Sequence, residues 1–477
     1  MSQQSHEREE RILVISDIHL GEDILQEGPE KLSEYIKRLN FELSSFIRGH
    51  LQSEEESFRW RLIINGDLFD FLKVGVEEEE FADADKSVAG ETVWKLHRIV
   101  EIHRPIFKAL AEFVSEGHRL TVIEGNHDAE LYFKEVKDAF RKEIFALCPG
   151  TSSEEQAKFE SRIEFCTWFH AKIGRFHIEH GHQYDPLCAF AHLLAPFDKN
   201  RKDLAIPIIH RGIAPFAEVL TDFSTHGLEK WGLLDYLKFG FSQSPKVLYR
   251  AALVYFRIAF DMVVHSGKKR EEELAEFKTE HESALGDMAQ EDIYGLPVLK
   301  NLDALKAKPA EYSWFKIFHA LFLDRLALVV MLPILVILSF LCFSGLQVLW
   351  AILTSLGVVL GGISLLNSVN RPDSEHELRS AATRISRLTG ARFVIFGHSH
   401  YPELKAISAQ EGGAFGDSCF YINTGSWVTR EIINDPPLGM TYAELNAEGG
   451  FLKRWQSRAT PEVLFSSKEL QRGGQAS

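Results

Sequence analysis

Short apolar runs that end in polar residues recur along the first part of the chain. Residues 11–20 (RILVISDIHL), 61–70 (RLIINGDLFD) and 119–128 (RLTVIEGNHD) each have the pattern of a buried strand followed by polar side chains. Between the last two, residues 91–114 carry apolar side chains at helical spacing, interrupted near Pro105. Strands that alternate with helices in this way predict an α/β domain.

The strand pattern continues to residue 182 and returns near residue 391. Residues 167–185 are typical of a hairpin, and strands follow at 392–400 and 419–428, with a further strand pair on either side of Glu448. We therefore expect four sections. They are a first part of the domain at 11–190, a helical insert at 191–385, a second part of the domain at 386–465, and a tail at 466–477 that is disordered after Leu470.

One long apolar segment interrupts the insert. No charged residue occurs from Leu326 to Val369, and Ser344-Gly345 near the middle can form a turn. Because one membrane span needs about 20 residues, the segment predicts a two-helix transmembrane hairpin at about 326–366. The alternative is a helical hairpin in a soluble core. Such a hairpin normally shows one polar face, and this segment shows none.

Two other parts of the chain leave their role open. The segment 205–264 mixes apolar and basic residues, which fits helices on a bilayer surface as well as ordinary packing against the domain. The acidic run Glu77–Glu80, within residues 74–90, indicates an exposed loop, and the sequence does not say whether it covers a site.

Charge and cysteine content narrow the class of protein. The net charge is −15, with 68 acidic and 53 basic residues, which argues against binding nucleic acid through its phosphates. The five cysteines form no CxxC pair, as expected in a reducing compartment without a disulfide framework. The polar N-terminal segment has no apolar core of a signal peptide, so we expect none.

Residues that can bind a metal follow several of the predicted strands. They are Asp17, His19, Asp67, Asn126, His127, His182, His398 and His400. In an open α/β sheet, side chains at the strand ends build the site. Carboxylate and imidazole ligands without thiolates suit Mn, Zn, Fe or Mg. One carboxylate can bridge two such ions, and a pair of ions clamps both oxygens of a phosphoryl transfer.

The motifs resemble those of the calcineurin-like metallophosphoesterase superfamily. They are D-x-H (Asp17, His19), G-D-x-x-D (66–70), G-N-H-D (125–128), G-H (181–182) and G-H-x-H (397–400). The resemblance covers about residues 11–190 and 390–455. It implies a four-layer αββα sandwich with a site for two divalent metal ions, with Mn favoured.

The resemblance also implies a role for each residue. One ion would be held by Asp17, His19, Asp67 and His400, and the other by Asp67, Asn126, His182 and His398. His127 would be the catalytic histidine, placed by Asp128, and a metal-bridged hydroxide would attack the phosphorus. Asp70 and His180 are either partners that hold ligands in place or structural residues.

The motif wording is most similar to that of bacterial UDP-2,3-diacylglucosamine hydrolases, which cleave a pyrophosphate on a lipid-linked nucleotide. That family has arginine where this chain has His127, and it lacks a helical hairpin of this kind. The expected substrate is thus a phosphodiester or pyrophosphate, lipid-linked in the favoured case. The alternatives are a soluble nucleotide or phosphoprotein, and a non-catalytic membrane scaffold on the same fold. Oligomeric state stays open.

The order of the motifs constrains the membrane topology. Four motifs precede the apolar segment and the fifth follows it, so both ends of the segment must lie on one side of the bilayer. Two spans satisfy this condition and one does not. The flanking residues Lys316, Arg325 and Arg371 favour a cytoplasmic catalytic domain on a protein that passes the membrane twice.

Overall fold

The structure is a computed structural model of the 477-residue chain. It describes residues 9–21, 33–51, 58–75, 87–148, 153–198, 203–207, 244–291, 293–321, 323–369, 374–407, 419–428, 439–457 and 459–473. The acidic run Glu77–Glu80 and most of the segment 205–243 lie outside these residues.

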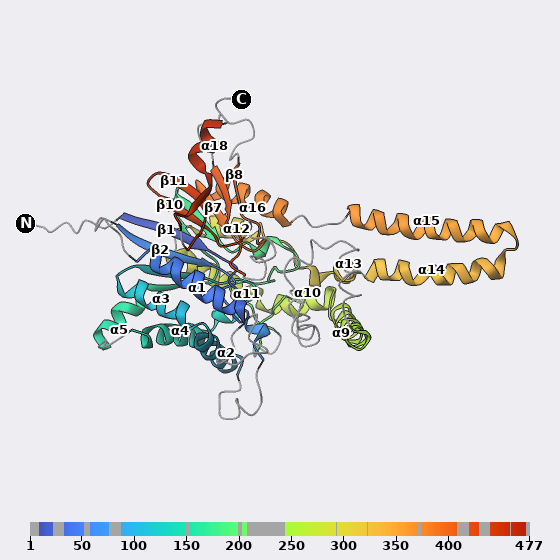
Figure 1. Cartoon of the computed structure of the whole chain (residues 1–477), viewed down its shortest axis with the longest axis horizontal. Coiled ribbons are helices and arrows are strands. Elements are labelled where there is room, and N and C mark those ends of the chain that lie inside the picture. Colours follow the sequence, from blue (N-terminus) through green and yellow to red (C-terminus); the bar gives the residue numbers. More distant parts are fainter. Residues whose placement is uncertain are drawn as a thin grey trace, which may run out of the picture.

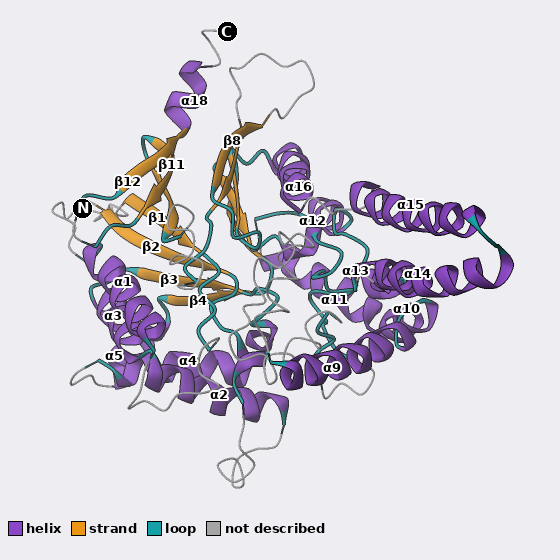
Figure 2. Ribbon diagram, turned by 45° about the vertical axis from the view of Figure 1, so that its right-hand side comes forward, coloured by secondary structure: helices purple, strands orange, loops and turns teal. Residues whose placement is uncertain are grey.

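The described strands form two sheets that pack face to face (Figure 2). The seven-stranded sheet has the order β12-β11-β10-β1-β2-β3-β4, and the five-stranded sheet has the order β5-β6-β7-β9-β8. The larger sheet consists of β1 (Glu9–Ile15), β2 (Phe58–Asn65), β3 (Arg119–Ile123), β4 (Ile163–Cys166), β10 (Thr441–Asn446), β11 (Gly449–Arg454) and β12 (Glu462–Ser466). The smaller consists of β5 (Phe169–Lys172), β6 (Phe176–Glu179), β7 (Phe393–Phe396), β8 (Glu403–Ile407) and β9 (Cys419–Asn423).

Alternation along β1 explains why the sheets have apolar neighbours on both faces. Ile12 and Val14 belong to the cluster between the two sheets, whereas Leu13 and Ile15 belong to the cluster under the outer helices. The helices over the larger sheet are α1 (Glu34–Gly49), α2 (Val88–Ile102), α3 (Arg104–Ser115), α4 (Lys134–Ala146) and α5 (Ser153–Glu160). These layers agree with the predicted α/β fold class, and the break between α2 and α3 falls near Pro105 as expected.

The smaller sheet is covered by α16 (Ser374–Thr389) and by helices of the insert, namely α11 (Lys278–Glu291) and α12 (Leu296–Asp303), while α10 (Lys268–Leu274) lies nearer the hairpin. Leu285, Leu299 and Leu302 pack in one cluster with Ile385 and Phe396. This part of the insert therefore shares a core with the sandwich.

The predicted hairpin is helical. It consists of α14 (Leu323–Cys342) and α15 (Leu346–Val369), joined at Gly345 in the left-handed region, and it projects from the rest of the molecule (Figure 1). Both helices are long and apolar enough to cross a membrane, and only 6% of either apolar window is buried. The short α13 (Trp314–Ala320) precedes the hairpin, and α9 (Pro245–Val264) lies beside its base.

The prediction that the chain is disordered after Leu470 is wrong for residues up to 473. Ser467–Gly473 form a helix, α18, that continues from β12. The Gly450 amide donates to Ser467 Oγ at 3.1 Å, Lys468 pairs with Glu448 at 3.0 Å, and Leu470 packs against the cluster between the sheets. These contacts hold a polar segment whose composition alone shows no apolar pattern.

Candidate metal centre

The predicted site residues meet where β1, β2, β3, β6 and β7 end. β1, β2 and β3 are parallel neighbours, and β6 is parallel to β7 in the facing sheet, so the carboxyl ends gather at one edge of the sandwich. Asp17 and His19 follow β1, Asp67 follows β2, and His398 and His400 follow β7. The edge therefore collects residues that are almost 400 positions apart in sequence.

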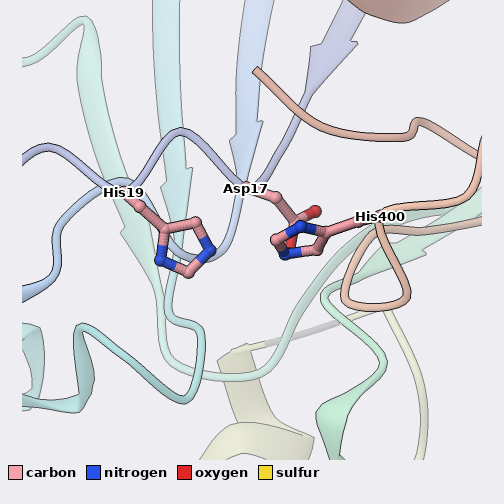
Figure 3. A group of neighbouring side chains, drawn as sticks. All are labelled: Asp17, His19 and His400. Carbon is pink, nitrogen blue, oxygen red and sulfur yellow. The ribbon is translucent and has the colours of Figure 1, made fainter. Parts of the chain in front are cut away.

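Asp17, His19 and His400 form the first group (Figure 3). Their ligand atoms lie within 4.8 Å of one another, and His400 Nε2 is 3.2 Å from Asp17 Oδ1. Burial raises the pKa of Asp17, but His400 and His180 outweigh it and hold that pKa below its usual range. Burial and the nearby His127 lower the pKa of His19 to about 4, so its ring is neutral, as metal binding requires.

Asp67 lies at the centre of the site. Its Oδ2 is 3.2 Å from His180 Nε2 and 3.6 Å from His19 Nε2, and its Oδ1 accepts the His127 amide at 2.9 Å. Burial opposes ionisation of this carboxyl, yet the imidazoles of His180 and His127 hold its pKa well below the usual range. A carboxylate that faces both groups of histidines can serve two ions at once.

His180, rather than His182, lies against Asp67 and Asn126. His180 Nε2 is 3.1 Å from Asn126 Oδ1, and its ligand atom groups with those of Asp17 and Asp67 within 4.8 Å. Burial disfavours a charged His180, but the carboxylates of Asp67 and Asp17 raise its pKa to about 9. The negative potential that holds this proton would equally attract a metal cation.

His182 is buried close by, in a different orientation. Gly181 has φ +105°, and His182 begins a short 3₁₀ turn, His182–Tyr184. His182 Nε2 lies 2.7 Å from Gln183 Nε2, and its ring centroid is 5.3 Å from that of His180. The sequence analysis assigned His182 as the metal ligand and left open whether His180 holds a ligand in place or is structural. The pattern His180-Gly181-His182 does not indicate which of the two rings faces the site.

His398 contacts a residue that the sequence analysis did not identify. Its amide donates to the Asp17 carboxylate at 3.1 Å, and its Nε2 lies 3.3 Å from Asp185 Oδ2. Asp185, Cys188 and His398 form another group of ligand atoms within 4.8 Å. The pairing with Asp185 occupies Nε2 and leaves Nδ1 as the ring atom that could bind an ion.

The carboxylate nearest to His127 is that of Asp70. His127 Nδ1 is 3.5 Å from Asp70 Oδ2, and Lys73 Nζ lies 3.3 Å from the same oxygen. Burial opposes a charged His127, but Asp67 and Asp70 raise its pKa. Asp70, which follows the second strand in the G-D-x-x-D motif, is therefore a direct neighbour of the candidate catalytic histidine.

The Asp128 carboxylate accepts backbone hydrogen bonds. The amides of Gly125 and Leu68 each donate at 2.7 Å, and that of Phe69 donates at 3.3 Å. These bonds join the loop after β3 to the loop after β2. Asp128 thus fixes the loop that carries His127 and does not contact the ring in any described hydrogen bond or ion pair.

The backbone of the site is unusual. Asp17, His19, Asp67, His398 and His400 all have φ between +52° and +69°, in the left-handed region that side chains other than glycine rarely adopt. Such conformations persist only where the surrounding structure holds them, and they cluster at functional sites. Gly125 is needed because a Cβ at that position would overlap the Asp67 carboxylate.

The set of donors fits divalent metal ions. Carboxylate and imidazole atoms, buried except for the partly buried His400, form three overlapping groups around Asp17, His19 and Asp67 and match the oxygen and nitrogen ligands of Mn, Zn, Fe or Mg. The sequence predicts Asp67 as the carboxylate shared by two ions, and in the structure that carboxylate lies between His19 and His180.

Comparison with known proteins agrees with this chemistry. Residues 10–236 match the family model for calcineurin-like phosphoesterases. The matched region begins in β1 and includes the first four motifs. A search of curated proteins gives no match. Members of this family typically bind two divalent metals and hydrolyse phosphoesters. Residues 10–236 of the chain are therefore similar to calcineurin-like phosphoesterases.

Proposed function

We propose that the chain is a membrane-anchored phosphohydrolase that depends on two divalent metal ions, Mn in the favoured case, and cleaves a phosphodiester or pyrophosphate bond. The observation that carries this proposal is the convergence of Asp17, His19, Asp67, His180 and His400 at one edge of the sandwich. A single family match suggests a phosphoesterase, and the ligand atoms within 4.8 Å of one another supply the site that such chemistry needs.

We assign one ion to Asp17, His19, Asp67 and His400, as predicted. For the other we assign Asp67, Asn126 and His398, and we replace His182 by His180 because of its 3.1 and 3.2 Å contacts with Asn126 and Asp67. When bound, the ions would polarise a phosphoryl oxygen and lower the pKa of a water molecule.

The chain's own residues complete the chemistry. His127, with its pKa raised beside Asp67 and Asp70, is suited to hold a proton at neutral pH and donate it to the leaving oxygen. Asp70, paired with Lys73, orients the His127 ring, and Asp128 fixes its loop. Asp185, 3.3 Å from His398 Nε2, would orient the His398 ring for metal binding.

The hairpin is the proposed membrane anchor. Its apolar side chains are uncovered along both helices, and the cost of leaving them in water favours a bilayer. Two spans return the chain to the side from which it left, which keeps His398 and His400 with Asp17. We place that side in the cytoplasm, in line with Lys316 and Arg325 before the first span and Arg371 after the second.

A lipid-linked phosphoester or pyrophosphate is the favoured substrate, because the anchor would hold the site at the bilayer. The motif resemblance to UDP-2,3-diacylglucosamine hydrolases supports the same choice. The second candidate is a soluble nucleotide or phosphoprotein substrate. A non-catalytic scaffold would not need this complete set of ligands, which argues against that function.

The test is Mn²⁺-dependent hydrolysis by the detergent-solubilised protein. Bis-p-nitrophenyl phosphate and a UDP-linked lipid are assayed side by side, with Asn126→Ala as the control variant. Turnover of both that collapses in the variant is the expected result, with the lipid preferred. Turnover of the diester alone would favour a soluble substrate. Failure to hydrolyse either, with Mn²⁺ bound, would favour the scaffold.

A further inference from the structure

Helix α9 is apolar on two opposite sides. On the inner side, Ile258 and Met262 pack with Ala310 and Ile317 in a small cluster at the base of the hairpin. This packing accounts for one apolar face, as in any amphipathic helix on a protein core. It leaves the other apolar face without a partner within the described residues.

The outer side carries a row of uncovered apolar residues. They are Tyr249, Leu253, Phe256, Phe260 and Val264, and between 53 and 73% of each is exposed. At 100° per residue, they lie within an arc of about 80°. We call this row the α9 stripe. A surface helix of a soluble protein normally turns a polar face outward, so the stripe calls for an apolar environment on that side.

The charges beside the stripe favour a bilayer over a protein partner. The exposed basic residues Lys246, Arg250 and Arg257 accompany it, with Asp261 as the single acidic residue of the helix. This basic helix contrasts with the net charge of −15 of the whole chain. Basic residues beside an apolar row suit a surface with anionic lipid headgroups.

The position of α9 places the stripe at the membrane boundary. The hydroxyl of Tyr255 bonds to the carbonyl of Leu321, between α13 and the first hairpin helix. In Figure 1 α9 is seen nearly end-on beside the base of the hairpin, which runs across the page. Trp314 and Phe315 on α13 are also exposed, and aromatic residues are typical of the interface.

We propose that α9 lies in the plane of the membrane, with the α9 stripe in the interface and the hairpin crossing beside it. The proposal rests on the membrane insertion of the hairpin. For α9, which is one part of the segment 205–264, it combines the two alternatives that the sequence left open. The inner face packs on the protein, and the outer face contacts lipid.

The same cluster connects α9 to the candidate metal centre. Leu187 packs against Met262 and Ile317, and Asp185, two residues earlier, contacts His398 at 3.3 Å. A helix that rests on the headgroups would thus hold the loop 185–188 close to the bilayer surface. The substrate class that fits is an amphiphile whose phosphoester lies at headgroup level, which deepens the proposed function.

The direct test is photocrosslinking of the full-length protein in vesicles with anionic phospholipids. Benzoylphenylalanine replaces Phe256 or Phe260, and the matched control replaces Phe41, a phenylalanine on α1 with 54% exposure and no link to the hairpin. Lipid adducts at 256 and 260, and none at 41, are expected. Adducts only to a second protein copy, or no lipid adduct at 256 and 260, would overturn the proposal.

A functional test separates this proposal from the enzymatic one. The double variant Phe256→Ser/Phe260→Ser should hydrolyse bis-p-nitrophenyl phosphate like the wild type but lose about tenfold in turnover of a phosphoester lipid embedded in vesicles. Equal losses on both substrates would contradict it. If the wild type hydrolyses neither, the proposed function fails, while the crosslinks still decide whether α9 contacts lipid.

Discussion

In the sandwich, polar side chains at the strand ends are covered, whereas in the hairpin apolar side chains are uncovered. Asp17 and Asp67 are at most 1% exposed, and Leu341 in α14 is 76% exposed. Burying carboxylates is costly unless they are paired, so the sandwich offsets that cost with imidazoles and a cation site. The hairpin has no such compensation within the described chain, and we propose that a bilayer covers its apolar side chains.

The first prediction concerns the loss of the central carboxylate of the candidate metal centre. Asp67→Ala should lower phosphohydrolase activity by about 10³-fold, because several kcal/mol of metal-based stabilisation depend on the central carboxylate. The rate of Mn²⁺-dependent hydrolysis of bis-p-nitrophenyl phosphate measures the loss. Arg48→Ala, at an exposed ion pair with Glu112, is the control and should keep its activity. Activity retained in Asp67→Ala would exclude the proposed site.

The second prediction separates two adjacent imidazoles. His180→Ala should lose about 10²-fold or more in activity, and His182→Ala less than tenfold, since only His180 lies within 3.2 Å of both Asp67 and Asn126. Both variants are compared for Mn²⁺ affinity by titration calorimetry and for folding by circular dichroism. The reverse order would restore the assignment based on sequence.

These two histidines show what a sequence can predict about this site. The strands and the residues that follow them were predictable, because apolar runs that end in Asp, His or Asn recur in order. The choice between His180 and His182 depends on the turn at Gly181, φ +105°, which reorients every side chain after it. Alternation along a strand gives no information about such a turn.

Contacts between residues far apart in the sequence could not be predicted either. Asp185 reaches His398 across 213 positions, and Asp70 reaches His127 through the pairing of β2 with β3. Neither contact leaves a local pattern. The same holds for α18, whose helical structure depends on contacts with Gly450 and Glu448 rather than on its own apolar spacing.

The third prediction tests whether the hairpin helices lie in a bilayer. Val330→Arg, near the middle of α14, should cost about 2.5–3.5 kcal/mol of insertion free energy if the helix crosses a bilayer. The same substitution at Leu346, in the far turn of the hairpin, should cost much less because arginine there reaches water. The membrane fraction that resists carbonate extraction measures both. Equal effects at the two positions would argue against a span.

The fourth prediction concerns Asp185, whose carboxylate contacts the ring of the proposed ligand His398. Asp185→Asn should weaken Mn²⁺ binding by about 10- to 100-fold, the usual effect of losing a carboxylate behind a histidine ligand. Titration calorimetry gives the affinity. Cys188→Ala is the matched variant in the same group, and an effect as large as that of Asp185→Asn would point to a thiolate ligand instead.

The smallest effect lies in the sandwich, away from the site. Buried His103, whose Nδ1 lies 2.8 Å from Asn40 Oδ1, has its pKa lowered by burial from 6.5 to about 3. Below pH 6.5 the unfolded chain therefore binds a proton at His103 that the folded protein does not bind. The contribution of His103 to the unfolding free energy is fully present above pH 6.5 and is lost as the pH falls toward 3. Between pH 6.5 and 5.5 this histidine should cost about 1 kcal/mol of unfolding free energy.

The test compares two histidine variants. Urea titrations followed by tryptophan fluorescence measure the unfolding free energy at both pH values. His103→Gln should abolish the part of the pH dependence that His103 causes, whereas His97→Gln, on the exposed side of α2, should leave the pH dependence unchanged. An unchanged pH dependence in His103→Gln would mean that His103 binds a proton as readily in the folded protein as in the unfolded chain. The cost of burying its charge would then be offset by neighbouring groups, as it is for the carboxylates of the metal centre.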